Sequence, residues 1–343
     1  MQSKLQSSAE IKKEVLTTSK ARQILDLITE EMFLVEAEFD RQASSNIQVI
    51  DYLGDYVRSS GGKRVRPALL LLSAYACGGD GASDGAVRLA TVMEMLHTAT
   101  LVHDDIIDNA RIRRSRESVN SRFGNQMAVL MGDWLYMSAF ETSLKERSLD
   151  ILEILTRLTR KMTEGELIQL TMIGDTDITE DKYFDILRRK TAYLFSGCCE
   201  IGAILAGSSA EERSALRDYG MNLGTAFQLA DDLLDFTSDE KSLGKASGAD
   251  LLEGKLTLPL ILLCEQQPEF KSELKNIIAD GTYENGARPR VLAKLEESQT
   301  IEKIRSIALG YAASARKNLE VLPQTKYSLA LEEIAKFVIE RNS

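Results

Sequence analysis

The sequence contains the stretch EMLHTATLVHDDIID at residues 94–108 and the related stretch FQLADDLLD at residues 227–235. Each stretch combines aliphatic residues at helical spacing with three aspartates. The first and last aspartate of each cluster lie four residues apart, which places them on one face of a helix. Because burying unpaired carboxylates in an apolar segment is costly, the pattern predicts helices whose carboxylates face a cation. An exposed helix surface is the alternative for either copy taken alone.

The two acidic clusters have the chemistry of a site for a divalent metal and a phosphorylated ligand. Mg²⁺ takes oxygen ligands, and in proteins it commonly joins one or two carboxylates to substrate phosphates. Two facing clusters would therefore hold a diphosphate between them through metal ions. His97 shares a helical face with Asp104 and Asp108, so we expect it to face this site, whereas we expect His103 to have a structural role.

The composition predicts an all-α protein. Of the 343 residues, 44% are hydrophobic and 27% are charged, which suffices for a substantial core. No proline lies between Pro67 and Pro259, and this segment is rich in helix-forming residues. The spacing of Ser209 and Glu212 is that of a capping box, which predicts a helix start. We expect a flexible arm at residues 1–20 and one helical domain at residues 21–343.

Charge and cysteine content exclude several classes of function. The net charge of −10 argues against a general role in nucleic-acid binding. The four cysteines lack zinc-site spacing, and two of them are adjacent, which favours a reducing compartment. The N-terminus lacks the apolar core of a signal peptide, and the longest apolar run is too short to span a bilayer. We therefore expect a soluble, cytoplasmic protein.

Cationic residues accompany both acidic clusters. The runs GGKRVRP at residues 61–67 and RIRRSR at residues 111–116 lie on either side of the first cluster in an otherwise acidic chain. They predict a second phosphate pocket, in which arginine and lysine bind the phosphate directly. Lys190 and Thr191 precede the second cluster, and Lys245 and Lys255 follow it in a glycine-rich segment. That segment could close over a bound ligand and exclude water.

Taken in this order, the motifs resemble those of the trans-type polyprenyl diphosphate synthases. The resemblance runs from about Ile24 to Glu340, and it includes GD at 132–133, GE at 165–166, KT at 190–191 and GK at 244–245 and 254–255. It implies an all-α bundle around a deep central cavity, usually dimeric. It also implies condensation of isopentenyl diphosphate with an allylic diphosphate by ionisation, condensation and elimination. The released diphosphate is the expected base, so we assign no side-chain general base.

The resemblance implies a role for each matching residue. Isopentenyl diphosphate would be bound by Lys63, Arg66, His97 and Arg114. The allylic diphosphate would be bound by Arg113, Lys190, Thr191, Gln228, Lys245 and Lys255. Mg²⁺, with three ions in this family, would be bound by Asp104, Asp108 and Asp231. Neighbouring carboxylates would act indirectly, through metal-bound water or by orienting the ligands: Asp105, Asp232 and Asp235. The residues expected to be catalytic are Asp104, Asp108, Asp231, Lys190 and Lys245.

The length of the product depends, in this family, on the positions five, eight and eleven residues before the first acidic motif. These positions are Ala99, Leu96 and Met93. Because Ala99 is small, we expect a long-chain product in the hexaprenyl to decaprenyl range, with Phe140 or Met137 as candidates for the floor of the tunnel. We expect transient membrane contact when this product is released.

Several alternatives remain at this stage. One is a short-chain farnesyl or geranylgeranyl diphosphate synthase, and another is a non-catalytic subunit of a heteromeric synthase, although both acidic clusters are complete. A His-Asp phosphohydrolase would need a further metal-binding histidine upstream of His97, and the sequence has none there. A terpene cyclase would not explain the cations at Lys63, Arg66 and Arg114.

Overall fold

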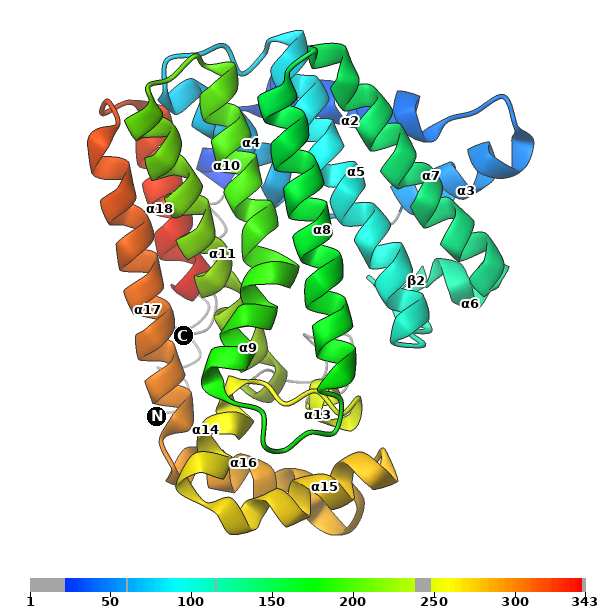
Figure 1. Ribbon diagram of the computed structural model, residues 1–343, viewed down its shortest axis with the longest axis vertical. Coiled ribbons are helices and arrows are strands. Elements are labelled where there is room, and N and C mark those ends of the chain that lie inside the picture. Colours follow the sequence, from blue (N-terminus) through cyan, green and yellow to red (C-terminus); the bar gives the residue numbers. More distant parts are fainter. Residues whose placement is uncertain (1–21, 60, 115, 238–247, 341–343) are drawn as a thin grey trace, which may run out of the picture.

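Long helices lying side by side form the bundle seen in Figure 1, a computed structural model that describes residues 22–59, 61–114, 116–237 and 248–340. The helices of the first half are α2 (Thr29–Ala43), α3 (Gln48–Arg58), α4 (Val65–Ala76), α5 (Asp84–Ile107), α6 (Val119–Phe123), α7 (Asn125–Ser143) and α8 (Leu149–Thr171). Those of the second half are α9 (Glu180–Leu187), α10 (Tyr193–Leu205), α11 (Ala210–Thr237), α13 (Ala249–Leu252), α14 (Leu258–Gln266), α15 (Lys271–Asp280), α16 (Ala287–Glu297), α17 (Thr300–Asn318) and α18 (Lys326–Glu340).

Short elements connect these helices. The described residues contain one hairpin, in which β1 (Ile112–Arg113) pairs antiparallel with β2 (Arg116–Glu117). A π-helical turn, Arg188–Ala192, joins α9 to α10. The 3₁₀ turns are Leu144–Glu146, Pro268–Phe270, Glu284–Gly286 and Leu319–Val321. The expected all-α fold is therefore confirmed. The predicted arm at residues 1–20 lies outside the described residues.

Helix α4 occupies the centre of the bundle. Its residues Leu69, Leu70, Leu71 and Leu72 are all fully buried, and the helix packs against α5, α10 and α18. A helix that is apolar on every side is stable only when other elements surround it. This explains why the LLLL run is a core helix. One hydrophobic cluster extends from α2 to α18 around it.

Local sequence signals set the ends of the long helices. Ser209 and Glu212 form the predicted capping box at the start of α11: Glu212 accepts a hydrogen bond from the Ser209 amide at 2.8 Å, and Ser209 Oγ accepts one from the Glu212 amide at 3.2 Å. Ser83 caps α5 and Ser148 caps α8 in the same way, each with its side-chain oxygen.

Two glycines permit close helix packing near the acidic clusters. A Cβ atom at Gly132 of α7 would collide with the imidazole of His103 on α5. His103 Nε2 lies 3.1 Å from the carbonyl oxygen of Val129 in α7, so the imidazole packs against α7, which accords with the structural role expected of it. A Cβ at Gly224 of α11 would lie 2.7 Å from Cα of Ala192. The absence of side chains at these positions brings α5 against α7 and α11 against the π-helical turn.

The structure also tests three smaller expectations. Met137 on α7 is 63% exposed, so the suggestion that it floors an internal tunnel is wrong, whereas Phe140 packs against the core. All four cysteines are free thiols. No helix in the described ranges is both long and apolar enough to cross a membrane.

Candidate active site

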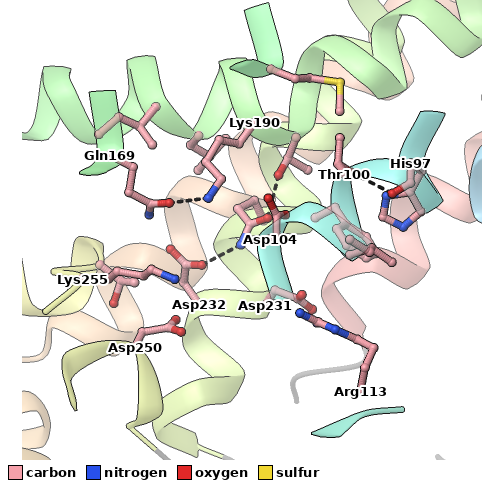
Figure 2. A pocket seen from close by; sticks show the side chains of 18 of the residues that line it. His97, Thr100, Asp104, Arg113, Gln169, Lys190, Asp231, Asp232, Asp250 and Lys255 are labelled. Atoms are coloured by element: carbon pink, nitrogen blue, oxygen red, sulfur yellow. Dashed lines mark hydrogen bonds between the residues drawn. The ribbon is translucent and has the colours of Figure 1, made fainter. Parts of the chain in front are cut away.

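Aspartates from both acidic clusters line one cavity of about 940 Å³. Asp104 enters it from the C-terminal end of α5, and Asp231 and Asp232 enter from α11, so residues far apart in sequence face one another (Figure 2). Of the face predicted to be shared by His97, Asp104 and Asp108, His97 and Asp104 line this cavity, and Glu94 lines it with them.

The aspartates of the first cluster have three different environments. Asp104 lines the cavity, and burial raises its pKa to about 7, with Glu166 and Asp108 adding to the effect against Lys190. Asp108, the C-cap of α5, accepts a hydrogen bond from Lys255 Nζ at 2.8 Å. Asp105 is buried away from the cavity lining and accepts a hydrogen bond from Arg113 Nε at 2.7 Å. Of the three aspartates only Asp104 lines the cavity, and Asp108 adjoins it through Lys255, which does line it.

The second cluster is arranged similarly on α11. Asp231 lines the cavity and is exposed to it. Asp232 also lines it but is only 5% exposed, and it accepts hydrogen bonds from Gln228 Nε2 at 2.8 Å and from Tyr183 Oη at 2.5 Å. Burial and the nearby Asp250 raise the pKa of Asp232 to about 7, against the effect of these two hydrogen bonds. Asp235 is buried beside the backbone amide of Asp250, at 3.4 Å.

Most of the cations predicted to flank the second cluster reach the same cavity. Lys190 and Thr191 lie on the π-helical turn, where Lys190 contacts Gln169 and forms an ion pair with Glu166 at 2.5 Å. Thr191 Oγ1 donates a hydrogen bond to Gln228 at 2.8 Å. Lys255 also lines the cavity; burial lowers its pKa, but the hydrogen bond and charge of Asp108 outweigh this effect, so its pKa is raised. Lys245 lies outside the described residues.

The basic loop before α4 forms a second cationic region on the cavity wall. Lys63 of this loop and Arg66 in the first turn of α4 line the cavity together with His97 and Arg114. Arg114 donates a hydrogen bond to the carbonyl oxygen of Gly61, and a Cβ at Gly62 would lie 2.7 Å from Arg114 Nη1. The glycine pair therefore lets the loop pack directly onto a guanidinium group.

Burial determines the charge state within this second region. Burial lowers the pKa of His97 well below its ordinary value, and Arg66 and Arg114 lower it further, so the imidazole is neutral. Burial also lowers the pKa of Arg66, whose Nε atom has no hydrogen-bond partner among the described residues. Such an orphaned donor beside a cavity fits an anionic ligand.

The donor set also fits Mg²⁺, although it forms no complete metal cage. Within the described ranges, no three histidine, cysteine, aspartate or glutamate side chains are grouped closely enough to hold an ion by themselves. Mg²⁺ usually takes only one or two carboxylates and completes its shell with water and phosphate oxygens. Asp104 and Asp231 are carboxylates of this kind, on opposite walls of one cavity, and the raised pKa of Asp104 shows that its charge lacks full compensation.

The positions expected to control product length precede Asp104 on α5. Ala99, Leu96 and Met93 are buried in the core and do not line the cavity. A Cβ at Gly197 of α10 would lie 2.6 Å from Cδ2 of Leu158 and 3.5 Å from Cε of Met93. Side chains of α5 and α8 therefore fill the space between these helices and α10.

Sequence reasoning missed two interactions that shape the site. Tyr183 contacts Asp232, although its position seven residues before Lys190, two helical turns away, could have indicated a shared face. Arg64, which belongs to the basic loop, instead pairs with Glu36 at 2.5 Å and with Glu94 at 2.8 Å. No local sequence signal identifies these partners, which come from α2 and α5.

The chain is similar to known proteins along most of its length. A family model described as Polyprenyl synthetase matches residues 47–295. The octaprenyl diphosphate synthase of Escherichia coli (strain K12) is 39% identical over 320 residues, which cover 93% of this chain and 98% of that protein. A short chain isoprenyl diphosphate synthase of Methanothermobacter thermautotrophicus is 37% identical over 84% of this chain and 89% of its own length. The crystal structure of a polyprenyl synthase from Caulobacter crescentus CB15, complexed with calcium and isoprenyl diphosphate, has a TM-score of 0.88 at 34% identity and covers 94% of this chain and 98% of its own.

Proposed function

The chain belongs to the polyprenyl synthetase family, and from this premise we propose that it is a trans-polyprenyl diphosphate synthase with a long-chain product. The reaction condenses isopentenyl diphosphate with an allylic diphosphate. The observation that carries the proposal is the single cavity into which Asp104 and Asp231 project from opposite helices, with a basic region on its wall. A catalytic domain spanning residues 21–343 accords with the one hydrophobic cluster from α2 to α18.

The allylic diphosphate would be bound between the two acidic clusters. Mg²⁺, with three ions as the number we propose, would be held by Asp104, Asp108 and Asp231 and would neutralise the charge that develops on the leaving diphosphate. Lys190 and Lys255 lie beside these carboxylates and would stabilise the same charge through direct hydrogen bonds. The other residues proposed for this diphosphate are Arg113, Thr191, Gln228 and Lys245.

Isopentenyl diphosphate would be bound at the basic loop. Arg66 offers its unpartnered Nε atom, and Arg114 is held in place by the carbonyl oxygen of Gly61. His97 is neutral and would donate a hydrogen bond without adding charge. Together with Lys63, these groups would place the double bond of isopentenyl diphosphate next to the carbon atom that loses diphosphate. Holding both reactants in register removes much of the entropic barrier to their condensation.

The long-chain assignment depends on the side chains of α5 that precede Asp104. Each added five-carbon unit gains a few kcal/mol if it is buried, at about 0.8 kcal/mol for each CH₂-sized group, so growth continues until side chains block it. Ala99 offers little obstruction, and Met93 is a flexible side chain opposite Gly197. We therefore favour a hexaprenyl to decaprenyl product over the short-chain alternative, and the intact acidic clusters disfavour a non-catalytic subunit.

The reaction can be tested directly. Purified protein is incubated with Mg²⁺, farnesyl diphosphate and labelled isopentenyl diphosphate, and the products are sized by chromatography. We expect products of six to ten isoprene units, and none after the metal is removed with EDTA. Products that stop at farnesyl or geranylgeranyl diphosphate would support the short-chain alternative. No product from folded protein with Mg²⁺ would refute the enzymatic proposal.

We also propose a cytoplasmic homodimer that contacts membranes transiently as the product is released. The free thiols accord with a reducing compartment. Val129, Leu130 and Met137 on α7 are large apolar residues that are 42–64% exposed, and a second copy could cover them. Light scattering should give twice the monomer mass of 38.1 kDa, and Leu130→Glu should reduce it. A monomeric wild-type protein would contradict the dimer.

A further inference from the structure

Asp232 is a buried carboxylate that accepts hydrogen bonds from two neutral groups. It is only 5% exposed, Oδ2 accepts from the hydroxyl of Tyr183 and Oδ1 accepts from the amide of Gln228. One donor on each oxygen fixes the plane of the carboxylate as well as its position. Because each oxygen has two lone-pair sites, each of these bonds leaves a second site available for other donors or cations.

Tyr183 itself is held firmly. It lies on α9, is 7% exposed, and packs edge to face on Phe184 with ring centroids 5.4 Å apart. Edge-to-face packing is a favourable arrangement of aromatic rings. The buried ring therefore has little freedom to move its hydroxyl away from Asp232. A short hydrogen bond of 2.5 Å to an oxygen of this acid is consistent with that restraint.

The contacts form a closed loop between α9 and α11. Helix α9 leads directly into the π-helical turn that carries Lys190 and Thr191. Thr191 donates to Gln228, Gln228 donates to Asp232, and Tyr183 donates to the same Asp232. The turn and the second acidic cluster are thus joined at two points. Single π-helical turns within α-helices are frequently found at functional sites, and this turn carries a lysine that lines the cavity.

We propose that Tyr183 is a positioning residue for the allylic diphosphate site, because its hydroxyl fixes Asp232, and with it the second acidic cluster, relative to the turn that carries Lys190. This inference rests on the proposed function. Tyr183 makes no bond in the reaction and acts through Asp232. Partners that orient metal-binding groups typically change metal affinity or activity by about 10- to 100-fold when they are removed. The structure assigns this role to α9, which contributes none of the predicted motifs.

The test compares Tyr183→Phe with a matched variant, Tyr311→Phe. Tyr311 packs near the same Phe184, and its hydroxyl accepts a hydrogen bond from Arg188 at 3.5 Å. Both variants lose one hydroxyl group near α9, but only Tyr183 touches Asp232. Calorimetry measures the Kd for inorganic pyrophosphate in the presence of Mg²⁺, and steady-state kinetics give separate KM values for farnesyl diphosphate and isopentenyl diphosphate.

For Tyr183→Phe we expect about a tenfold rise in the Kd for pyrophosphate and in the KM for farnesyl diphosphate. The KM for isopentenyl diphosphate should stay within about twofold, because its pocket uses other residues. The Tm should fall by no more than about 3 °C. For Tyr311→Phe the Kd and both KM values should match those of the wild type. If Tyr183 had a merely structural role, Tyr183→Phe would instead lower the Tm and raise the KM values for both substrates together. That result would overturn the proposal.

A double substitution tests whether Tyr183 affects pyrophosphate binding through Asp232. In an Asp232→Ala background, adding Tyr183→Phe should change the Kd by less than about twofold, because the partner is already absent. A full tenfold effect in both backgrounds would overturn the positioning role. Wild-type protein that makes no polyprenyl product would refute the proposed function. Normal pyrophosphate affinity in Tyr183→Phe, with an active wild type, would refute the role of Tyr183 alone.

Discussion

The ligand-free protein should lose stability as pH rises towards the pKa of Asp104, and Asp104→Asn should remove this loss. Burial raises the pKa of Asp104 from 3.8 to about 7. Between these values the folded protein holds a proton that the unfolded chain has released, so the free energy of unfolding falls as pH rises. At about 1.4 kcal/mol per pH unit, the loss reaches about 4 kcal/mol above pH 7.

Thermal melts of the wild type and Asp104→Asn without metal, at pH 5 and pH 8, measure this effect. The stability of the variant relative to the wild type should increase by about 3 kcal/mol between the two pH values, because part of the loss has already occurred at pH 5. For a chain of this length, that difference corresponds to about 4 °C in Tm. Asp177→Asn is a control, because Lys271 lowers the pKa of this exposed carboxyl; it is ionised in the folded and unfolded states at both pH values, so its substitution should change stability equally at pH 5 and pH 8.

Binding of Mg²⁺ and pyrophosphate should stabilise the wild type more than Asp104→Asn. A bound cation compensates the charge of Asp104, so the ligand should raise the Tm of the wild type more at pH 8 than at pH 6 and should raise that of Asp104→Asn much less. The substitution would thus stabilise the empty protein and weaken ligand binding. The reasoning is refuted if the Tm difference between Asp104→Asn and the wild type is the same at pH 5 and pH 8.

Three further substitutions test separate parts of the site. Gly132→Ala should lower stability by about 1–3 kcal/mol in thermal melts, because the added methyl group collides with His103; an unchanged Tm would show that α7 can shift. Lys255→Ala should raise the KM for the allylic diphosphate about tenfold and leave that for isopentenyl diphosphate unchanged, because it removes the cation beside Asp108; equal changes in both KM values would contradict this assignment. Ala99→Tyr should shorten the product to farnesyl or geranylgeranyl diphosphate on chromatography, and an unchanged product length would count against the proposed tunnel.

Much of the site could be predicted from the sequence because helical spacing determines which side chains share a face. Asp104 lies seven residues after His97, and both line the cavity. The repeated acidic motif also indicated correctly that α5 and α11 would face each other. Composition sufficed for the fold class, since a long proline-free segment with apolar residues at helical spacing has no reasonable alternative to helices.

What could not be predicted depends on contacts between helices. The orientation of Asp105 away from the cavity follows from its pairing with Arg113 on the hairpin. The prediction for Met137 was wrong because the size of a side chain does not show which face of the helix carries it. Gly132 points inwards against His103, and five residues at about 100° each turn the helix by about 140° away from that direction. Met137 therefore faces outwards.

Several charges in and around the cavity are paired with one another in this structure. Lys255 pairs with Asp108, Lys190 with Glu166, and Arg113 with Asp105. These pairs allow carboxylates and cations to be partly buried together at a tolerable desolvation cost. A diphosphate bound with metal ions would exchange partners with these groups: each carboxylate would gain a metal ion in place of its cation, and each cation would gain a phosphate in place of its carboxylate. Binding then substitutes one set of ion pairs for another, so the site needs neither an exposed charge cluster nor a complete metal cage to be ready for its ligand.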